Sequence, residues 1–170
     1  MKIKRLGILM MLAAAVLSMT SCKPRYKSRL EDPTQTLAAN AVVNIDFDQL
    51  HNDVIENYEG DEMFAFIKDL DISGDNDAKT VTVLLSVTED TSDDALSVFM
   101  SDLLKSISNA AIIQDSRYTA PTNQSFGSFY DSYSVNYTIT RGEETVEDAT
   151  VSPGEGFSYD PSVDVSLIEG

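Results

Sequence analysis

The sequence predicts an α+β domain: a small antiparallel or mixed sheet of about four strands, in the order β-β-α-β-β, with one long amphipathic helix packed on one face. Residues 80–88 and 133–140 alternate apolar and polar side chains, the period of a strand that is buried on one face. Between them, residues 95–113 place apolar side chains three and four positions apart, as an amphipathic helix does. Strand pairs on both sides of a helix are typical of a sheet with that helix on one face.

The first strand pair is preceded by a predicted short helix, with Asp46 as its N-cap and Gly60 as its end. Its apolar residues recur at helical spacing: Phe47, Leu50, Val54, Ile55 and Tyr58. Residues 63–72 fit either a strand or a helix. We favour the strand, because the turn-forming residues 73–79 and the alternating residues 80–88 follow, and one hairpin accounts for both runs.

The long helix and the second strand pair follow. Thr91 and Asp94 stand at capping-box spacing and predict the start of the helix. The side facing away from the sheet should carry its polar residues: Ser97, Ser101, Asp102, Lys105, Ser106 and Ser108. Residues 145–151 should pair with 133–140 as an edge strand, because their apolar face is weak, and a last short strand is expected at Val163, Val165 and Leu167. If strands 80–88 and 133–140 are parallel neighbours, their crossover should be right-handed.

Composition excludes several functional classes. The 170 residues are 42% hydrophobic and 24% charged, which is an ordinary globular composition. The formal net charge of −16 repels phosphate backbones, so nucleic acid is not an expected partner. One His, one Cys and no Trp leave few groups for metal or nucleophilic chemistry, and no phosphate-binding glycine loop, CxxC pair or zinc spacing occurs. We therefore expect a protein that is not an enzyme.

The N-terminus has the layout of a secretory signal peptide. Lys2, Lys4 and Arg5 precede an apolar run of 14 residues, 6–19, which is shorter than the roughly 20 residues that span a bilayer as a helix. The run ends at the only cysteine of the chain, in the sequence Met19, Thr20, Ser21, Cys22. Export and removal of the signal are therefore expected.

This junction resembles the lipobox of bacterial lipoprotein precursors, although Met19 stands where that family prefers Leu. The resemblance implies that the signal peptide is cut before Cys22 and that the Cys22 thiol is diacylated, for example by palmitate. The lipids would then hold the mature chain on a membrane of the bacterial cell envelope. Lys23 follows, not the Asp associated with inner-membrane retention in some bacteria, so the outer membrane or the periplasmic side is expected rather than the cytoplasm.

These features predict a signal peptide at 1–21, a lipid-anchored basic stub and tether at 22–40, and a single acidic α+β domain at 41–170. All 28 acidic residues lie at Glu31 or beyond. Four basic residues lie directly after Cys22: Lys23, Arg25, Lys27 and Arg29. The stub either lies against anionic headgroups or is a solvated linker, and the sequence leaves both interpretations open.

One acidic segment, 69–80, resembles an EF-hand calcium loop in part. The expected oxygen ligands stand at positions one, three, five, seven and nine: Asp69, Asp71, Ser73, Asp75 and Asp77. Gly74 takes the glycine position, but Thr80 replaces the bidentate Glu at position twelve, and strand-forming residues follow where a helix should. The favoured interpretation is an acidic turn, and calcium binding is the alternative.

The connection 115–132 is long for a compact domain, and long connections are often functional. Its aromatic residues stand among Ser, Asn, Gln and Gly, a mixture found on binding surfaces: Tyr118, Phe126, Phe129 and Tyr130. They could bind a protein or a carbohydrate partner. Alternatively they belong to the core, for which Phe129 and Tyr130 are the best candidates because they lead into a strand.

The sequence thus predicts a lipid-anchored envelope protein that acts as a binding or structural module, with no cofactor unless calcium binds at 69–80. The remaining alternative is a small hydrolase that uses Asp/Glu pairs or His51. We expect His51 to be a surface residue, because it lies on the predicted polar side of the short helix.

Overall fold

The computed structural model describes residues 42–163 and Val165. All of them belong to the second of the two units into which the chain divides, Met1–Ala41 and Val42–Gly170. The predicted signal peptide, Cys22 and the basic stub therefore lie outside the described residues. The elements are α2 (Phe47–Ile55), the 3-10 helix η2 (Glu62–Phe64), β1 (Ile67–Asp75), β2 (Thr80–Val87), α3 (Asp93–Gln114), the 3-10 helix η3 (Ser128–Asp131), β3 (Ser134–Arg141) and β4 (Glu144–Val151).

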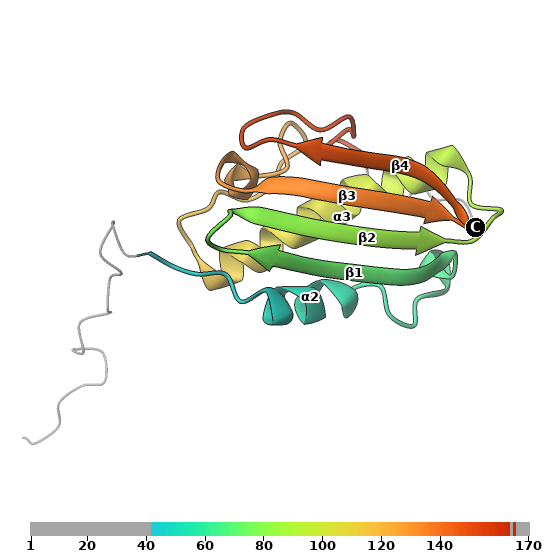
Figure 1. The fold of residues 1–170 in the computed structure, drawn as a ribbon, viewed down its shortest axis with the longest axis horizontal. Coiled ribbons are helices and arrows are strands. Elements are labelled where there is room, and N and C mark those ends of the chain that lie inside the picture. The colour runs from blue at the N-terminus through green and yellow to red at the C-terminus, as the bar shows by residue number, and fades with distance from the viewer. Residues whose placement is uncertain (1–41, 164, 166–170) are drawn as a thin grey trace, which may run out of the picture. The chain divides into compact units, whose positions relative to one another are not determined.

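The fold is α+β, with the predicted order β-β-α-β-β. Four strands form one mixed sheet in the order β1-β2-β3-β4. The two hairpins are antiparallel, and β2 and β3 are parallel neighbours with Val83 opposite Tyr137. Helix α3 connects these two parallel strands behind the sheet, so the crossover has the expected right hand (Figure 1).

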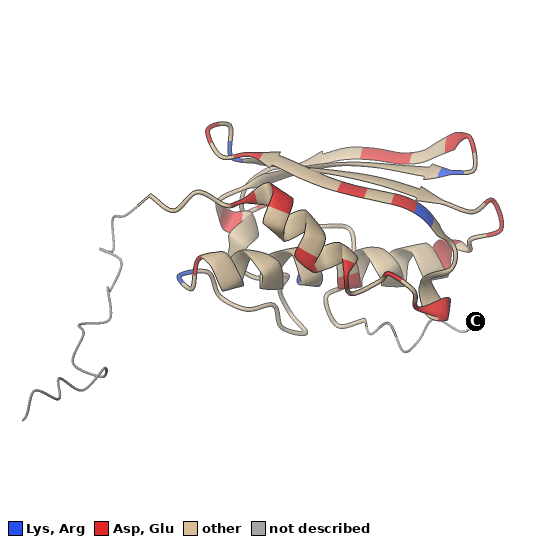
Figure 2. Ribbon diagram, turned by 90° about the horizontal axis from the view of Figure 1, so that it is seen from below, with Lys and Arg blue, Asp and Glu red and all other residues tan. Residues whose placement is uncertain are grey.

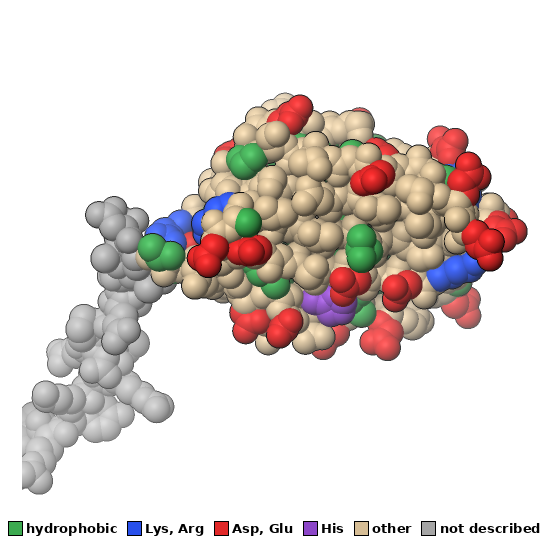
Figure 3. All heavy atoms as spheres, in the orientation of Figure 1, with side chains coloured by type: hydrophobic (Ala, Val, Ile, Leu, Met, Phe, Trp, Pro, Cys, Tyr) green, Lys and Arg blue, Asp and Glu red, His purple; other side chains and the backbone are tan. Residues whose placement is uncertain are grey.

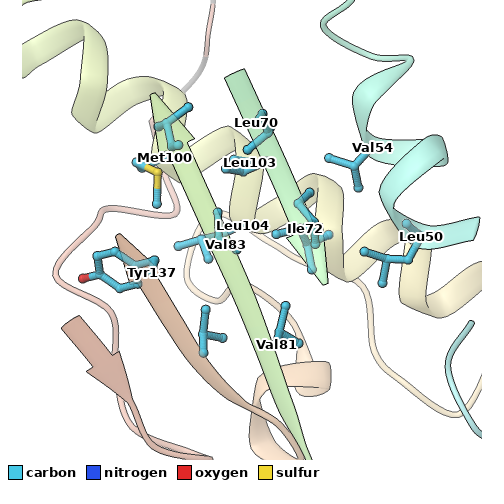
Figure 4. Close-up of a cluster of buried hydrophobic side chains, with 14 of the residues drawn as sticks. Leu50, Val54, Leu70, Ile72, Val81, Val83, Met100, Leu103, Leu104 and Tyr137 are labelled. Atoms are coloured by element: carbon cyan, nitrogen blue, oxygen red, sulfur yellow. The ribbon is translucent and has the colours of Figure 1, made fainter. Parts of the chain in front are cut away.

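The core lies between the sheet and the two helices, which cover the same face (Figure 2). Side chains of both helices point at the inner face of the strands (Figure 4). The residues labelled in Figure 4 are all buried, with at most 8% of their surface exposed: Leu50, Val54, Leu70, Ile72, Val81, Val83, Met100, Leu103, Leu104 and Tyr137. Helix α2 begins where the sequence predicts, because the Asp46 carboxylate accepts from the Gln49 amide at 3.0 Å. It ends at Ile55, earlier than the predicted end at Gly60.

The ambiguous segment 63–72 contains both kinds of structure. The Asp61 carboxylate accepts from the Met63 amide at 2.9 Å and caps η2, so the expected strand begins only at Ile67. At its other end the strand is longer than predicted: it continues through Gly74 to Asp75, into the residues predicted as a turn. The Phe47 ring packs against Gly74 so closely that a methyl group there would lie 2.4 Å from it.

The N-cap of α3 is not the predicted Thr91. The Ser92 hydroxyl accepts from the Ala95 amide at 3.1 Å and caps the helix. Thr91 is instead buried, and its hydroxyl lies 2.9 Å from that of Thr88. The two threonines close the turn that follows β2. Ser92, the residue after Thr91, therefore caps the helix.

Two residues predicted on the solvent side of α3, Ser101 and Ser108, are fully buried. The connection 115–132 covers the helix beside Ser108, and the Ser101 hydroxyl donates to the Ser97 carbonyl at 2.9 Å. The Tyr130 hydroxyl donates to the Leu104 carbonyl at 2.7 Å, and a methyl group on Gly127 would lie 2.4 Å from the Ser108 hydroxyl oxygen. Helix α3 is therefore packed on two sides rather than one.

Among the described residues, α3 is the one helix long and apolar enough to cross a membrane by length and composition, with a mean hydropathy of 1.3. Core helices of soluble proteins pass the same test. Leu103, Leu104 and Ile107 of α3 are fully buried between the sheet and the loops, as expected for a core helix.

Both outer strands are interrupted by an unpaired residue. On β1, Ile67 and Asp69 face the consecutive residues Val87 and Ser86, so Lys68 is extra. On β4, which is an edge strand as predicted, the pairing shifts in the same way at Val146. Beyond β4, Val163 lies in no strand, so the predicted last strand is not formed there, and Leu167 lies outside the described residues.

Candidate functional site

The acidic residues of the predicted calcium loop are spread along a strand and a turn. Asp69, Asp71 and Ser73 lie in β1 and are exposed. Asp75 closes the hairpin, where its carboxylate accepts from the amides of Asp77 and Ala78 at 2.7 and 3.0 Å. The loop conformation that the EF-hand resemblance implies is therefore not formed. No group of three or more acidic, His or Cys side chains in the described part of the chain could hold a metal ion.

The face of the sheet opposite the helices is open and consists largely of short polar side chains (Figure 3). Hydroxyl groups pair across its strands, as between Thr80 and Ser134 at 3.1 Å and between Thr140 and Ser86 at 3.1 Å. Leu84 is the exposed large hydrophobic residue on this face.

The aromatic residues of segment 115–132 are more buried than a binding surface requires. Phe129 is fully buried, Tyr130 and Phe126 nearly so, and Tyr118 half-buried. The Tyr118 ring packs edge-on against Phe129, with centroids 5.4 Å apart. Phe129 and Tyr130 are therefore core residues, as the alternative interpretation expected.

Phe126 and Tyr130 also line a cavity of about 280 Å³, which we call the two-loop pocket. Its other wall is the segment after β4, which contributes Phe157 and Tyr159. Neither ring is among the predicted binding residues, although both stand among Gly, Ser and Pro like those of segment 115–132. The same mixture of residues could have identified them.

Two hollows larger than the two-loop pocket lie along α2. One, of about 430 Å³, lies between α2 and α3, and a second, of about 550 Å³, lies between α2, η2 and β1. Both are lined by Tyr58 and Phe64, so they adjoin. We call the pair the Tyr58 groove.

Tyr58 is fixed between the two helices. Its hydroxyl lies 2.9 Å from the Asp102 carboxylate and 2.9 Å from the Ser106 hydroxyl, which are one turn apart on α3. Its ring packs edge-on against Phe64 at 4.9 Å and Phe99 at 5.0 Å. Burial, and then the neighbouring Asp102 charge, raise the pKa of Tyr58 well above its ordinary value. The hydroxyl is therefore a neutral polar group that Asp102 and Ser106 hold in the wall of the groove.

The groove combines apolar surface with an acidic rim. Ile113, 77% exposed, and Ala110 line the cavity between the helices, and Ile55 and Ile67 line the other. Its carboxylates are Asp53 and Asp102 in the first cavity and Glu59, Asp61, Glu62 and Asp69 in the second. Figure 2 shows acidic residues along α2 and the segment after it. Lys68 is the one Lys or Arg among the lining residues.

His51 has a structural role in this wall. Its Nδ1 accepts a hydrogen bond from the Ile72 amide at 3.1 Å and lies 3.7 Å from the Asp71 carboxylate. In an antiparallel pair, every second residue of a strand directs its amide and carbonyl away from the partner strand. Ile72 is such a residue, because its amide bonds to His51 and not to β2. His51 thus covers part of the outer edge of β1, and its side chain stays 31% exposed at the surface, as the sequence predicts (Figure 3).

Comparison with known proteins gives no match: no protein-family model fits the chain, and neither a curated protein nor a solved structure matches it significantly. The candidate sites therefore rest on the geometry and chemistry of this chain.

Proposed function

We propose that this protein is a lipid-anchored binding module of the bacterial cell envelope, held at the membrane through Cys22 and binding a partner in the Tyr58 groove without catalysis. The observation that carries the anchor is the cysteine directly after a basic lead and a 14-residue apolar run. Two or three acyl chains provide the second membrane signal that stable anchoring needs.

The groove supports binding rather than chemistry. Its cavities, of about 430 and 550 Å³, fall within the roughly 300–1,000 Å³ typical of ligand sites. Two of its candidate acid–base groups are already engaged: His51 accepts from the Ile72 amide, and the Tyr58 hydroxyl is held by Asp102 and Ser106. The other candidates are the carboxylates of its acidic rim. A hydrolase needs such a group aimed at its substrate. We therefore favour a binding role.

Replacement of Cys22 by serine is expected to abolish incorporation of radiolabelled palmitate, because the hydroxyl of serine does not replace the thiol in lipoprotein acylation. The measurement is labelling in growing cells, followed by mass spectrometry of the N-terminal peptide. Ser21→Ala is the matched control and should keep the label, because a small residue still precedes the cysteine. Label retained by Cys22→Ser, or an unmodified Cys22 thiol in the wild type, would overturn the anchor.

A photo-crosslinking residue at position 113 is expected to capture a partner in intact cells, because Ile113 lines the groove and is 77% exposed. The same residue at position 84, on the open face of the sheet, is the control. Asn109→Trp places a large ring at the groove wall and should suppress the product at position 113. Equal products from both positions, or a product that survives Asn109→Trp, would count against binding in the groove.

A further inference from the structure

We propose that the two-loop pocket binds the guanidinium group of an arginine side chain presented by a protein partner. This site is separate from the Tyr58 groove and does not depend on it. Four aromatic rings and two carboxylates line the pocket: Phe126, Tyr130, Phe157, Tyr159, Asp131 and Glu155. Rings attract a cation over their faces, and carboxylates bond a guanidinium in pairs.

Phe157 is the central ring of the pocket. It packs edge-on against Phe126 at 5.3 Å and against Tyr130 at 4.9 Å. Phe126 and Tyr130 are nearly buried, whereas Phe157 is half-buried and keeps accessible surface. The two buried rings thus hold Phe157 in place, and Phe157 provides accessible aromatic surface for the ligand.

The charge of the pocket selects a cation. Asp131 and Glu155 are both exposed, and the Glu155 carboxylate is oriented by a hydrogen bond from the Ser152 amide at 3.1 Å. None of the lining residues is Lys or Arg. With a net charge of −16, the whole chain also attracts cations and repels anions. A planar guanidinium can stack on a ring and bond a carboxylate at the same time, which a lysine ammonium does less well.

The glycines of the second loop leave the pocket accessible. A methyl group placed on Gly156 would meet no atom within 4 Å, and Gly156 has no positive φ. Neither packing nor backbone conformation therefore requires a glycine at this position. The volume of about 280 Å³ is just below that of sites for drug-sized ligands, which suits one side chain.

The test is a calorimetric titration of the mature full-length protein in detergent micelles with N-acetyl-glycyl-arginyl-glycine amide. The matched probe replaces arginine by citrulline, which has nearly the same shape but no charge. We expect at least tenfold tighter binding of the arginine peptide and weaker binding as salt is raised. Equal affinities for the two peptides would overturn the proposal, as would tighter binding of free arginine or of N-acetylglucosamine.

Variants localise the site. Gly156→Leu and Phe157→Leu should each weaken binding of the arginine peptide at least tenfold, the first by filling the pocket and the second by removing its central ring. Asp131→Asn should weaken it several-fold, whereas Asp71→Asn, which removes the same charge from the open face of the sheet, should leave it within twofold. Circular dichroism checks that each variant is folded. Wild-type affinity in folded Gly156→Leu would exclude this pocket.

Discussion

Replacement of Phe99 by alanine is expected to lower the free energy of unfolding by about 3–5 kcal/mol, the usual cost of removing a buried phenyl ring. Phe99 is fully buried on α3. Its ring contacts those of Tyr58 at 5.0 Å, Phe66 at 5.7 Å and Phe64 at 5.8 Å. Alanine would leave a cavity at the point where α2, η2 and the start of β1 meet the long helix. Urea denaturation followed by circular dichroism measures the loss.

The matched control is Leu84→Ala, on the open face of the sheet. Leu84 is 45% exposed, so its truncation removes much less buried surface and should cost about 1 kcal/mol or less. Comparable losses in the two variants would show that the ring contacts of Phe99 are not central to stability. Because Phe99 supports the Tyr58 ring, the Phe99 variant should also give less crosslinking from position 113.

The Asp115 carboxylate is expected to make the fold less stable in acid. Asp115 ends α3 and is 2% exposed, and it accepts from Nε and Nη2 of Arg117 at 2.8 and 2.6 Å and from the Arg117 amide at 3.1 Å. The hydrogen bonds from the Arg117 side chain hold the pKa of Asp115 below its ordinary value. A depressed pKa contributes stability above the pKa of the unfolded chain, and this contribution is lost as pH falls through the folded value.

Asp115→Asn should therefore be less stable than the wild type at pH 7, by about 1–3 kcal/mol for lost charged hydrogen bonds. The difference should shrink as the pH falls below the folded pKa of Asp115, where the wild-type carboxyl is also neutral. Thermal unfolding between pH 7 and pH 2 measures it. Ser97→Ala, an exposed change on the same helix that removes no titratable group, should keep the acid slope of the wild type. An Asp115→Asn curve parallel to the wild type would contradict the assignment.

Helices and strands whose apolar residues recur at regular spacing were predicted from the sequence, because burial of one face requires apolar side chains at that spacing. The strands β2 and β3 and the helix α3 are of this kind. Element ends were less predictable, since neighbouring residues compete for the same role. Thr91 and Ser92 can both cap a helix, and the choice follows from the hydroxyl contact of Thr91 with Thr88, which depends on the turn between β2 and α3.

The candidate sites were less accessible to sequence analysis because their walls come from distant segments. Tyr58 and Asp102 are 44 positions apart, and no local pattern joins them. Segment 115–132 was correctly recognised as rich in aromatic residues, but what its rings face depends on packing. Phe129 turns into the core, while Phe126 meets Phe157 from a loop after β4.

Within the described part of the chain, the extra residues Lys68 and Val146 interrupt the two strands that have a neighbouring strand on one side alone. A straight, regular edge strand would let the sheets of adjacent molecules pair into one continuous sheet. A β-bulge in each edge strand, one of them at a lysine, breaks the hydrogen-bond register that such an intermolecular sheet needs. We therefore expect copies of this protein to remain separate even when they are crowded together in two dimensions.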